Sequence, residues 1–215
     1  MQIDFTTTAM VRPELLSQTY SSFAKHLSGI KLSDSRLFIN VDPLPNGNPM
    51  EVISVAKRFF GEVQFHIATT PSHPAAVKWC WSQPDTEYIF NLQDDWVLTD
   101  GVSITNLVNE LKTYSKRYFQ IVLRAYKNQH NLSLAPSLIT KLMYQSYAKK
   151  LETNIGPEVQ MKKQRGITWL EGECPILPRA ALIYPDHKVI RDIGRDWMKS
   201  SSFKHDSGFL EWERK

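Results

Sequence analysis

The sequence lacks the short glycine motifs that mark the most common nucleotide-binding and hydrolase folds. No Gly-x-Gly-x-x-Gly turn follows its first apolar segment, and no Gly-Lys-Ser or Gly-Lys-Thr of the Walker type occurs. A Gly-x-Ser-x-Gly nucleophile motif is also absent. These absences disfavour a classical dinucleotide fold, a P-loop and an α/β-hydrolase.

Cysteine and long apolar runs are equally scarce. The two cysteines, Cys80 and Cys174, lie far apart and form no metal-type pair, so we expect a reducing, cytoplasmic setting. No run of about 18 apolar residues is present, and we therefore expect no transmembrane segment. The N-terminus has no basic segment followed by an apolar core, so we do not expect a signal peptide.

The remaining composition is that of an ordinary globular protein. The 215 residues are 42% hydrophobic and 22% charged, which suits one large domain. The net charge of +4 is unevenly distributed: residues 1–100 hold 7 Lys and Arg against 11 Asp and Glu, whereas residues 101–215 hold 19 against 11. The basic second half is either an ordinary solvated surface or a face for an anionic partner.

Apolar, β-prone segments alternate with helical patterns through the first half of the chain. This alternation is typical of an α/β fold with a mostly parallel sheet and helices on both faces. We expect strands at 3–10, 36–42, 63–69 and 88–96, with helices at 13–28, 52–60 and 75–83 between them. Further along we expect a helix at 104–111, a strand at 118–125, a long helix at 138–151 after Pro136, and short strands at 166–170 and 180–184.

Two adjacent carboxylates end the most apolar of these strands. In the segment Tyr88–Trp96, Asp94 and Asp95 follow directly on a β-prone run. Unpaired buried charges are costly, so the pair must lie where the strand leaves the sheet. In open α/β sheets this end faces the ligand crevice, where two carboxylates can bind a divalent cation and, through it, phosphate. The alternative is that they cap and precede the next helix.

The segment Leu-Gln-Asp-Asp-Trp at 92–96 resembles the Asp-x-Asp-type motif of GT-A fold glycosyltransferases of the family-2-like kind. The order of the other elements is similar too: Thr6-Thr7-Thr8 precedes Arg12-Pro13 and an amphipathic helix, a strand ends in Asp42, and a helix over Ala76–Trp81 precedes the motif. The resemblance covers residues 3–110 well and the remainder loosely. Gln93 departs from it, because an acid is usual at that position.

The resemblance implies a single Rossmann-like GT-A domain over residues 1–215. Residues 1–100 would be the nucleotide-sugar-binding half, and residues 101–215 would bind the acceptor and close over the donor. The donor would be a nucleotide sugar, foremost a UDP-sugar, with a Mn²⁺ or Mg²⁺ ion. Asp95 would ligate the metal, and Asp94 would contact it through water or bind the ribose. The nucleotide would be lined by Thr6, Thr7, Thr8, Arg12 and Asp42.

Both Arg12 and Asp42 have structural alternatives. Arg12 is also a candidate ion-pair partner, and Asp42 is a candidate turn-forming side chain ahead of Pro43.

The C-terminal half supplies candidates for the remaining roles. The resemblance favours an inverting hexosyl or pentosyl transfer, which needs a base for the acceptor hydroxyl. Glu158 is our first choice, followed by Asp206 and Asp192. His205, ahead of His187, would be a third metal ligand. Charge-assisted hydrogen bonds to the diphosphate would come from Arg191, Arg195 and Lys204.

The basic second half, interleaved with tyrosines, would form the acceptor side. A polyanion suits it, and the favoured acceptor is duplex DNA carrying a hydroxymethylated base, as for a known class of small viral glycosyltransferases that would work in the host cytoplasm. No DNA-binding motif is present, however. Two alternatives stay open: the same chemistry on a cell-surface glycan or lipid carrier, and a non-catalytic nucleic-acid-binding α/β module.

Overall fold

The computed structural model describes residues 2–115, 118–123, 133–163, 181–183, 189–200, 203–205 and 212–214. Within this part, seven strands form one mixed sheet in the order β10-β8-β9-β5-β1-β3-β4. These strands are β1 (Asp4–Met10), β3 (Arg36–Asp42), β4 (Glu62–Ile67), β5 (Tyr88–Gln93), β8 (Gln120–Val122), β9 (Ser137–Thr140) and β10 (Ala181–Ile183).

Most neighbouring strands run parallel. β1 pairs in parallel with both β3 and β5, β3 with β4, and β10 with β8. Among the described strands of the sheet, β9 alone runs antiparallel to its neighbours, β5 and β8. The parallel strands therefore bring their carboxyl ends to one edge of the sheet, which is where ligands bind in open α/β folds.

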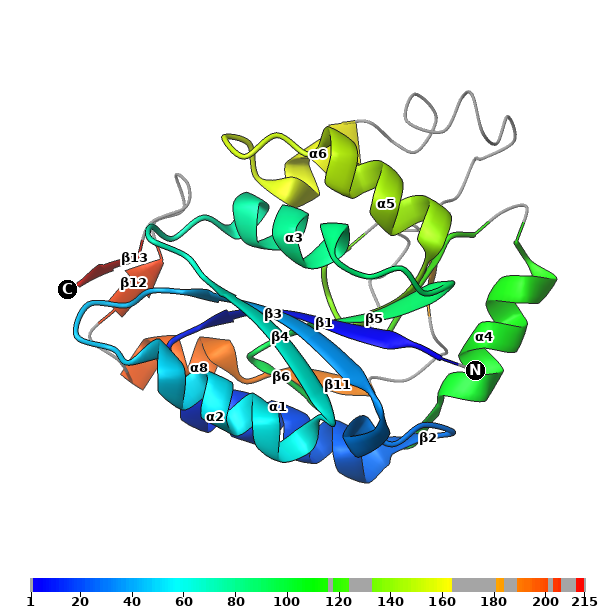
Figure 1. Cartoon of the computed structure of the whole chain (residues 1–215), viewed down its shortest axis with the longest axis horizontal. Helices are drawn as coiled ribbons and strands as arrows, with labels where there is room; N and C mark the ends of the chain where they lie inside the picture. Colours follow the sequence, from blue (N-terminus) through cyan, green and yellow to red (C-terminus); the bar gives the residue numbers. More distant parts are fainter. Residues whose placement is uncertain are drawn as a thin grey trace.

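Helices cover both faces of the sheet (Figure 1). On one face lie α1 (Pro13–His26) and α2 (Pro49–Phe59); on the other lie α3 (His73–Ser82), α5 (Lys141–Lys150) and α6 (Pro157–Lys163). The predicted α/β architecture, a mostly parallel sheet between helices, is confirmed. The division of function at residue 100 stays a prediction, and β5 and β9 from the two sides of that boundary pair within one sheet.

Local sequence explains where the first helices begin. Proline occupies the first turn of α1, α2 and α3, where a missing N–H costs no helical hydrogen bond. The Asn48 side chain caps α2 by accepting from the Met50 N–H at 3.0 Å, and Ser72 caps α3 by accepting from the Ala75 N–H at 3.4 Å. Each helix therefore starts soon after a strand ends, at the carboxyl edge of the sheet.

A hydrophobic core lies on each face of the sheet. On the face of α1 and α2, the Tyr20 ring packs edge-on against Phe60, with 5.1 Å between centroids, and Phe5 packs against Phe60 at 5.3 Å. On the other face, Trp81 of α3 meets Tyr147 of α5 edge-on at 6.0 Å. Both faces of the central strands β1, β3 and β5 are thus covered, so nearly every residue of these strands is buried.

The predicted long helix at 138–151 is wrong in its first turn. Residues 137–140 form β9, and the helix begins only at Lys141. Leu138 and Ile139 are adjacent, yet both are fully buried, because β9 lies inside the sheet with a core on each side. A short strand that is buried on both faces does not alternate between apolar and polar residues. Its sequence pattern therefore cannot be distinguished from that of a buried helix.

Other boundaries differ less. The strand predicted at 88–96 ends at Gln93 and resumes after a turn as β6 (Trp96–Leu98). The strand predicted at 180–184 is β10, and the one predicted at 166–170 lies outside the described residues. No helix among the described residues is both long and apolar enough to cross a bilayer.

Small elements complete the described structure. They are β2 (Leu27–Ser28), η1 (Leu32–Asp34), β7 (Val102–Ser103), α4 (Ile104–Thr113), β11 (Ile190–Asp192), α8 (Gly194–Ser200), β12 (Phe203–His205) and β13 (Trp212–Arg214). Of these, β11 pairs antiparallel with β6 and so brings residues near 192 beside the Asp94-Asp95 turn.

Candidate functional site

Asp94 and Asp95 form the turn between β5 and β6, at the carboxyl edge of the sheet. The predicted position of the pair, at the end of the strand, is confirmed. The two carboxylates have different surroundings. Only 4% of the Asp94 side chain is exposed, against 22% of the Asp95 side chain. Two adjacent aspartates therefore have different surroundings.

Asp94 is fixed in place by the start of the chain. Its Oδ2 accepts from the backbone N–H of Met10 at 2.9 Å and from Nε of Arg12 at 3.1 Å, and its Oδ1 accepts from Arg12 Nη2 at 2.5 Å. The hydroxyl of Thr19 donates to the Asp94 carbonyl oxygen at 2.9 Å. This carboxylate connects β5 to the end of β1 and the start of α1, and its charge is balanced by a buried bidentate ion pair.

Arg12 lies between the two aspartates and the C-terminal part of the structure. Its Nη2 also reaches Oδ2 of Asp95 at 3.2 Å, and its guanidinium lies over the Trp197 ring of α8, 5.1 Å from the centroid. Burial acts to lower the pKa of Arg12, but the charges of Asp94 and Asp95 oppose it and the net shift is upward. Arg12 is therefore charged, and the ion-pair alternative foreseen for it holds in this structure.

The surroundings of Asp95 disfavour its charged form. Burial, then the negative charge of Asp94, hold the pKa of Asp95 well above its usual range; Asp192 adds to this shift, and Arg12 opposes it. Its Oδ2 accepts from Arg12, whereas its Oδ1 accepts no hydrogen bond from the described residues. A carboxylate with an open oxygen and excess negative charge around it is a suitable ligand for a hard divalent cation.

The residues that follow β11 enclose Asp95 from the other side. The backbone N–H of Ile193 donates to the Asp95 carbonyl oxygen at 2.8 Å. A Cβ built on Gly194 would overlap the Asp95 carboxylate, so only glycine fits there without displacing it. Within the described residues, no group of three or more His, Cys, Asp and Glu side chains is placed to bind a metal ion. Asp95 is thus a candidate for a single ligand, and the described residues do not form a complete metal site.

The three threonines of β1 point to both faces of the sheet. Thr7 accepts from the Tyr20 hydroxyl at 3.0 Å, on the α1 face, and is fully buried. Thr6 donates to Oδ1 of Asn91 at 3.1 Å on the opposite face and is also fully buried. Thr8 is only half-buried, opposite Asn40 and Gln93 in the parallel ladders. Of the three, Thr8 is the one accessible to a ligand.

Asp42 ends β3 and belongs to a buried polar network. Its Oδ1 accepts from Asn40 Nδ2 at 2.8 Å, and its Oδ2 accepts from the Ser72 N–H at 3.1 Å. Burial raises the pKa of Asp42, and these hydrogen bonds partly offset the shift. Asn40 Oδ1 lies 2.7 Å from Nδ1 of His66, whose ring stacks on Trp79 at 5.5 Å.

Sequence reasoning missed Asn40 and His66. Asn40 is the one uncharged polar side chain in the apolar run of β3, and a buried amide needs partners, so that signal was present in the sequence. The contribution of His66 depends on the β3–β4 register, which pairs it with Asn40.

Of the site residues predicted in the C-terminal half, some are described by the structure, and of these only Arg195 and Asp192 are shown in contact with each other. Glu158 is exposed on α6, a helix that packs against α3. Arg191 is exposed, and Arg195 is exposed and paired to Asp192 with 2.9 Å between Nε and Oδ2. Asp206 and His187 lie outside the described residues, as do the side chains of Lys204 and His205.

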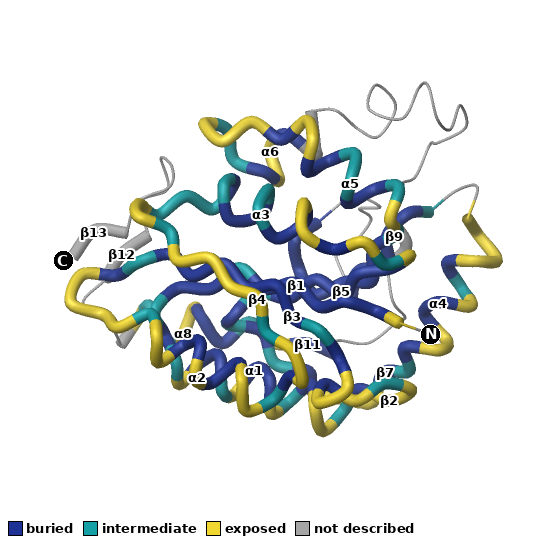
Figure 2. Tube along the Cα trace, in the orientation of Figure 1, coloured by how far each residue is buried: buried dark blue, intermediate teal, exposed yellow. Residues whose placement is uncertain are grey.

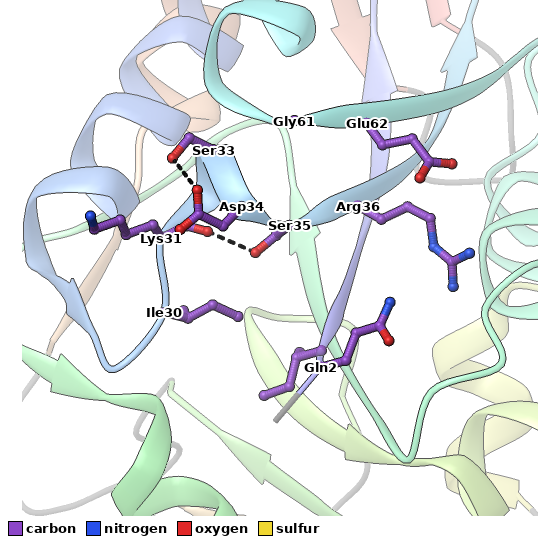
Figure 3. Close-up of a pocket in the computed structure, with 10 residues that line it drawn as sticks. Gln2, Ile30, Lys31, Ser33, Asp34, Ser35, Arg36, Gly61 and Glu62 are labelled. Atoms are coloured by element: carbon purple, nitrogen blue, oxygen red, sulfur yellow. Dashed lines mark hydrogen bonds between the residues drawn. The ribbon is translucent and has the colours of Figure 1, made fainter.

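A hollow of about 380 Å³ lies at the opposite edge of the sheet (Figure 3). It is lined by residues around the amino ends of β1, β3 and β4, among them Gln2, Arg36 and Glu62. The lining mixes charges of both signs and contains none of the predicted site residues. The candidate site is placed instead at the carboxyl edge, where the Asp94-Asp95 turn lies.

Comparisons with known proteins give the fold but no family. No family model matches the chain, and no curated protein does. Three solved structures illustrate the likeness. A mannosyltransferase from Pyrobaculum calidifontis, in complex with GDP-Man and Mn²⁺, has a TM-score of 0.60 at 10% identity, over 86% of this chain and 56% of that one. TarS from S. aureus has a TM-score of 0.57 at 8% identity, over 92% of this chain and 63% of that one.

The third similar structure is a cytidylyltransferase from Leptospira borgpetersenii, with a TM-score of 0.55 at 11% identity, over 94% of this chain and 86% of that one. This chain spans less than two thirds of the mannosyltransferase and TarS chains. Identities this low describe the fold alone. The chain has the Rossmann-like α/β fold that GT-A glycosyltransferases share with nucleotidyltransferases.

Proposed function

We propose that this protein is a metal-dependent glycosyltransferase that binds a nucleoside diphosphate sugar at the carboxyl edge of its sheet. The observation that carries the proposal is the difference in contacts between Asp94, which is buried and fully paired, and Asp95, which is partly exposed. Arg12 and the Met10 N–H occupy Asp94, so that residue orients the turn. Asp95 keeps an open oxygen, is partly exposed and lies in surplus negative charge, so it is the residue that binds a cation.

The proposed ion is Mn²⁺ or Mg²⁺, because a carboxylate oxygen suits a hard divalent cation. Asp95 would hold the ion, with His205 of the C-terminal segment as a proposed further ligand. A bound ion would supply neutralisation of the negative charge on the departing nucleoside diphosphate. The similar mannosyltransferase structure is a complex with GDP-Man and Mn²⁺, which is the same combination of ligand classes.

Sugar transfer fits the start of the chain better than nucleotidyl transfer does. An enzyme that acts on a nucleoside triphosphate must bind three phosphates. Glycine-rich loops bind phosphates by donating hydrogen bonds from their backbone N–H groups. Here only Val11 and Arg12 connect β1 to α1. The Met10 N–H donates to Asp94, and the Arg12 N–H donates to the Met10 carbonyl oxygen at 2.7 Å. These groups are therefore not available to phosphate.

The donor's nucleoside would lie over the α3-side ends of β1 and β3. Thr8 is half-buried there, and Asp42 and Asn40 form a polar network next to it. A UDP-sugar is the proposed donor. Arg191, Arg195 and Lys204 are proposed to contact the diphosphate, and Glu158 and Asp206 remain the proposed candidates for the base.

The basic second half of the chain is proposed to bind the acceptor. Lys112, Lys141, Lys149 and Lys150 are described, but many other basic residues of the second half lie outside the described part of the chain. A hydroxymethylated DNA base and a glycan or lipid carrier are the alternative acceptors, which a product assay distinguishes.

The test is a donor assay that separates the two transferase chemistries. The protein is incubated with a panel of nucleotide sugars and Mn²⁺, with and without DNA or glycan acceptors, and nucleoside diphosphate release is measured. We expect release that EDTA and Asp95→Asn both abolish. Asp34→Asn, the same substitution at the opposite edge of the sheet, is the control and should leave release unchanged. Pyrophosphate release from nucleoside triphosphates and a sugar phosphate, without nucleoside diphosphate release, would contradict the proposal in favour of nucleotidyl transfer.

A further inference from the structure

The β4 strand is an open edge of the main sheet. It pairs with β3 along six residues, from Arg36↔Glu62 to Val41↔Ile67, and no described strand pairs with its other side. Figure 2 shows β4 exposed over most of its length. Exposed edges are normally protected by proline, lysine or a bulge. Residues 62–67 contain neither residue type, and the register with β3 is unbroken.

The backbone groups on the open side belong to three residues. The Glu62 N–H donates to the Ser35 carbonyl oxygen, and the Ala68 N–H donates to the Val41 carbonyl oxygen. In a parallel ladder, every second residue of a strand bonds to the same neighbour, so the even-numbered residues of β4 serve β3. Val63, Phe65 and Ile67 therefore direct their N–H and C=O groups away from the sheet.

The same three residues form an apolar row. Phe65 is 41% exposed and Ile67 36% exposed, although both are large hydrophobic side chains, and Val63 is half-buried. The Lys57 ammonium lies over the Phe65 ring, 5.8 Å from its centroid, and covers it only in part. The other face of the strand carries the exposed polar side chains of Glu62, Gln64 and His66. Among the described residues, β4 thus combines backbone groups that no strand pairs with an apolar face that is only partly covered.

The sequence of β4 is palindromic in chemical character. Val63-Gln64-Phe65-His66-Ile67 reads β-branched, polar, aromatic, polar, β-branched in both directions. If a second copy pairs antiparallel with a two-fold axis at Phe65, then Phe65 faces Phe65, Val63 faces Ile67, and Gln64 faces His66. Apolar meets apolar, and no like charges oppose each other. A strand from another protein would not require this symmetry, whereas an isologous dimer does.

We propose that two copies of this chain associate through antiparallel pairing of their β4 strands about a two-fold axis at Phe65. The pairing joins the two sheets into one and uses the N–H and C=O groups of Val63, Phe65 and Ile67. The pairing does not depend on the proposed transferase activity, because Val63, Phe65 and Ile67 belong neither to the Asp94-Asp95 turn nor to the Asn40–Asp42 network.

The first test is the mass of the full chain in solution, by light scattering over a wide concentration range. We expect about twice the chain mass of 24.8 kDa. Phe65→Lys should weaken the association about tenfold or more, because two ammonium groups then meet on the axis. Tyr114→Lys removes a similarly exposed aromatic ring, 45% exposed at the end of α4, and should leave the mass unchanged. A monomer at every concentration, or a dimer that Phe65→Lys leaves intact, would overturn the proposal.

A cysteine cross-link tests the register. Hydrogen-bonded partners in an antiparallel pair have Cα atoms about 5.5 Å apart, within reach of a disulfide. In a Cys174→Ser background, Phe65→Cys should form an intermolecular disulfide on mild oxidation. Tyr114→Cys should not. Circular dichroism checks that each variant is folded. Equal cross-linking of both variants would indicate random collision and contradict the two-fold pairing.

Discussion

Gly194 lies against the Asp95 carboxylate so closely that a Cβ atom in its place would overlap Oδ2. We therefore expect Gly194→Ala to push the carboxylate away or to shift the start of α8. Overpacking of this kind costs about 1–3 kcal/mol. Metal-dependent nucleotide binding should weaken about tenfold or more, as measured by calorimetry, while the circular dichroism spectrum stays that of the wild type.

Gly101→Ala is the matched control for that prediction, since a Cβ there would have no neighbour within 4 Å. It should leave both binding and stability unchanged. If Gly194→Ala binds nucleotide and metal as the wild type does, then Asp95 does not need its present position to bind them.

Asp94 and Asp95 should give opposite results when each is replaced by asparagine. Asp94→Asn leaves the buried Arg12 without its main counter-charge, and breaking such a pair costs about 3 kcal/mol or more. For a chain of this size, the thermal midpoint should fall on the order of 10 °C. Asp95→Asn should change the midpoint little and remove metal-dependent binding. Equal loss of stability in the two variants would refute the division of roles between them.

Arg12→Lys should not behave as a conservative change. Lysine keeps the charge, but it cannot donate to both oxygens of Asp94 and to Asp95 at once, and it loses the planar contact with Trp197. We expect lower stability together with weaker nucleotide binding. Arg36→Lys is the comparison, because Arg36 pairs with Asp4 and Asp85 at the amino ends of the strands and should affect stability alone.

Cys80 should be unreactive in the folded protein. Its thiol is fully buried on α3, donates to the carbonyl oxygen of Thr7 at 3.3 Å, and has a pKa raised to about 12 by burial. A raised pKa means less thiolate, and only the thiolate reacts with an alkylating agent. In a Cys174→Ser variant at mildly alkaline pH, we expect labelling only after denaturant is added. Labelling of the native protein at the rate of a free thiol would contradict this packing.

The first half of the fold could be predicted from sequence because its strands and helices carry their own signals. The apolar run of β3 ends at Asp42, and Pro13 and Pro49 mark helix starts. β9 could not be predicted in this way. Leu138 and Ile139 are both buried only because β5 and β8 flank them, and that arrangement is set by the whole sheet.

The candidate site could likewise be predicted only as far as local sequence determines it. Asp94 and Asp95 are adjacent in the sequence, so their place at a strand end was predictable. Their different roles were not, because these depend on Arg12, 82 residues earlier, and on Gly194, almost one hundred residues later. Such long-range contacts leave no local pattern.

Mn²⁺-dependent binding of a nucleoside diphosphate to the wild type and to Asp95→Asn decides whether Asp95 binds a metal for the donor. Calorimetric titrations with UDP, GDP and CDP, each with Mn²⁺ and with EDTA, make the comparison. We predict that at least one nucleotide binds the wild type only when Mn²⁺ is present, and that Asp95→Asn loses this binding while remaining folded. Binding of equal strength to both proteins, or the absence of Mn²⁺-dependent binding by the wild type for all three nucleotides, would contradict the assignment.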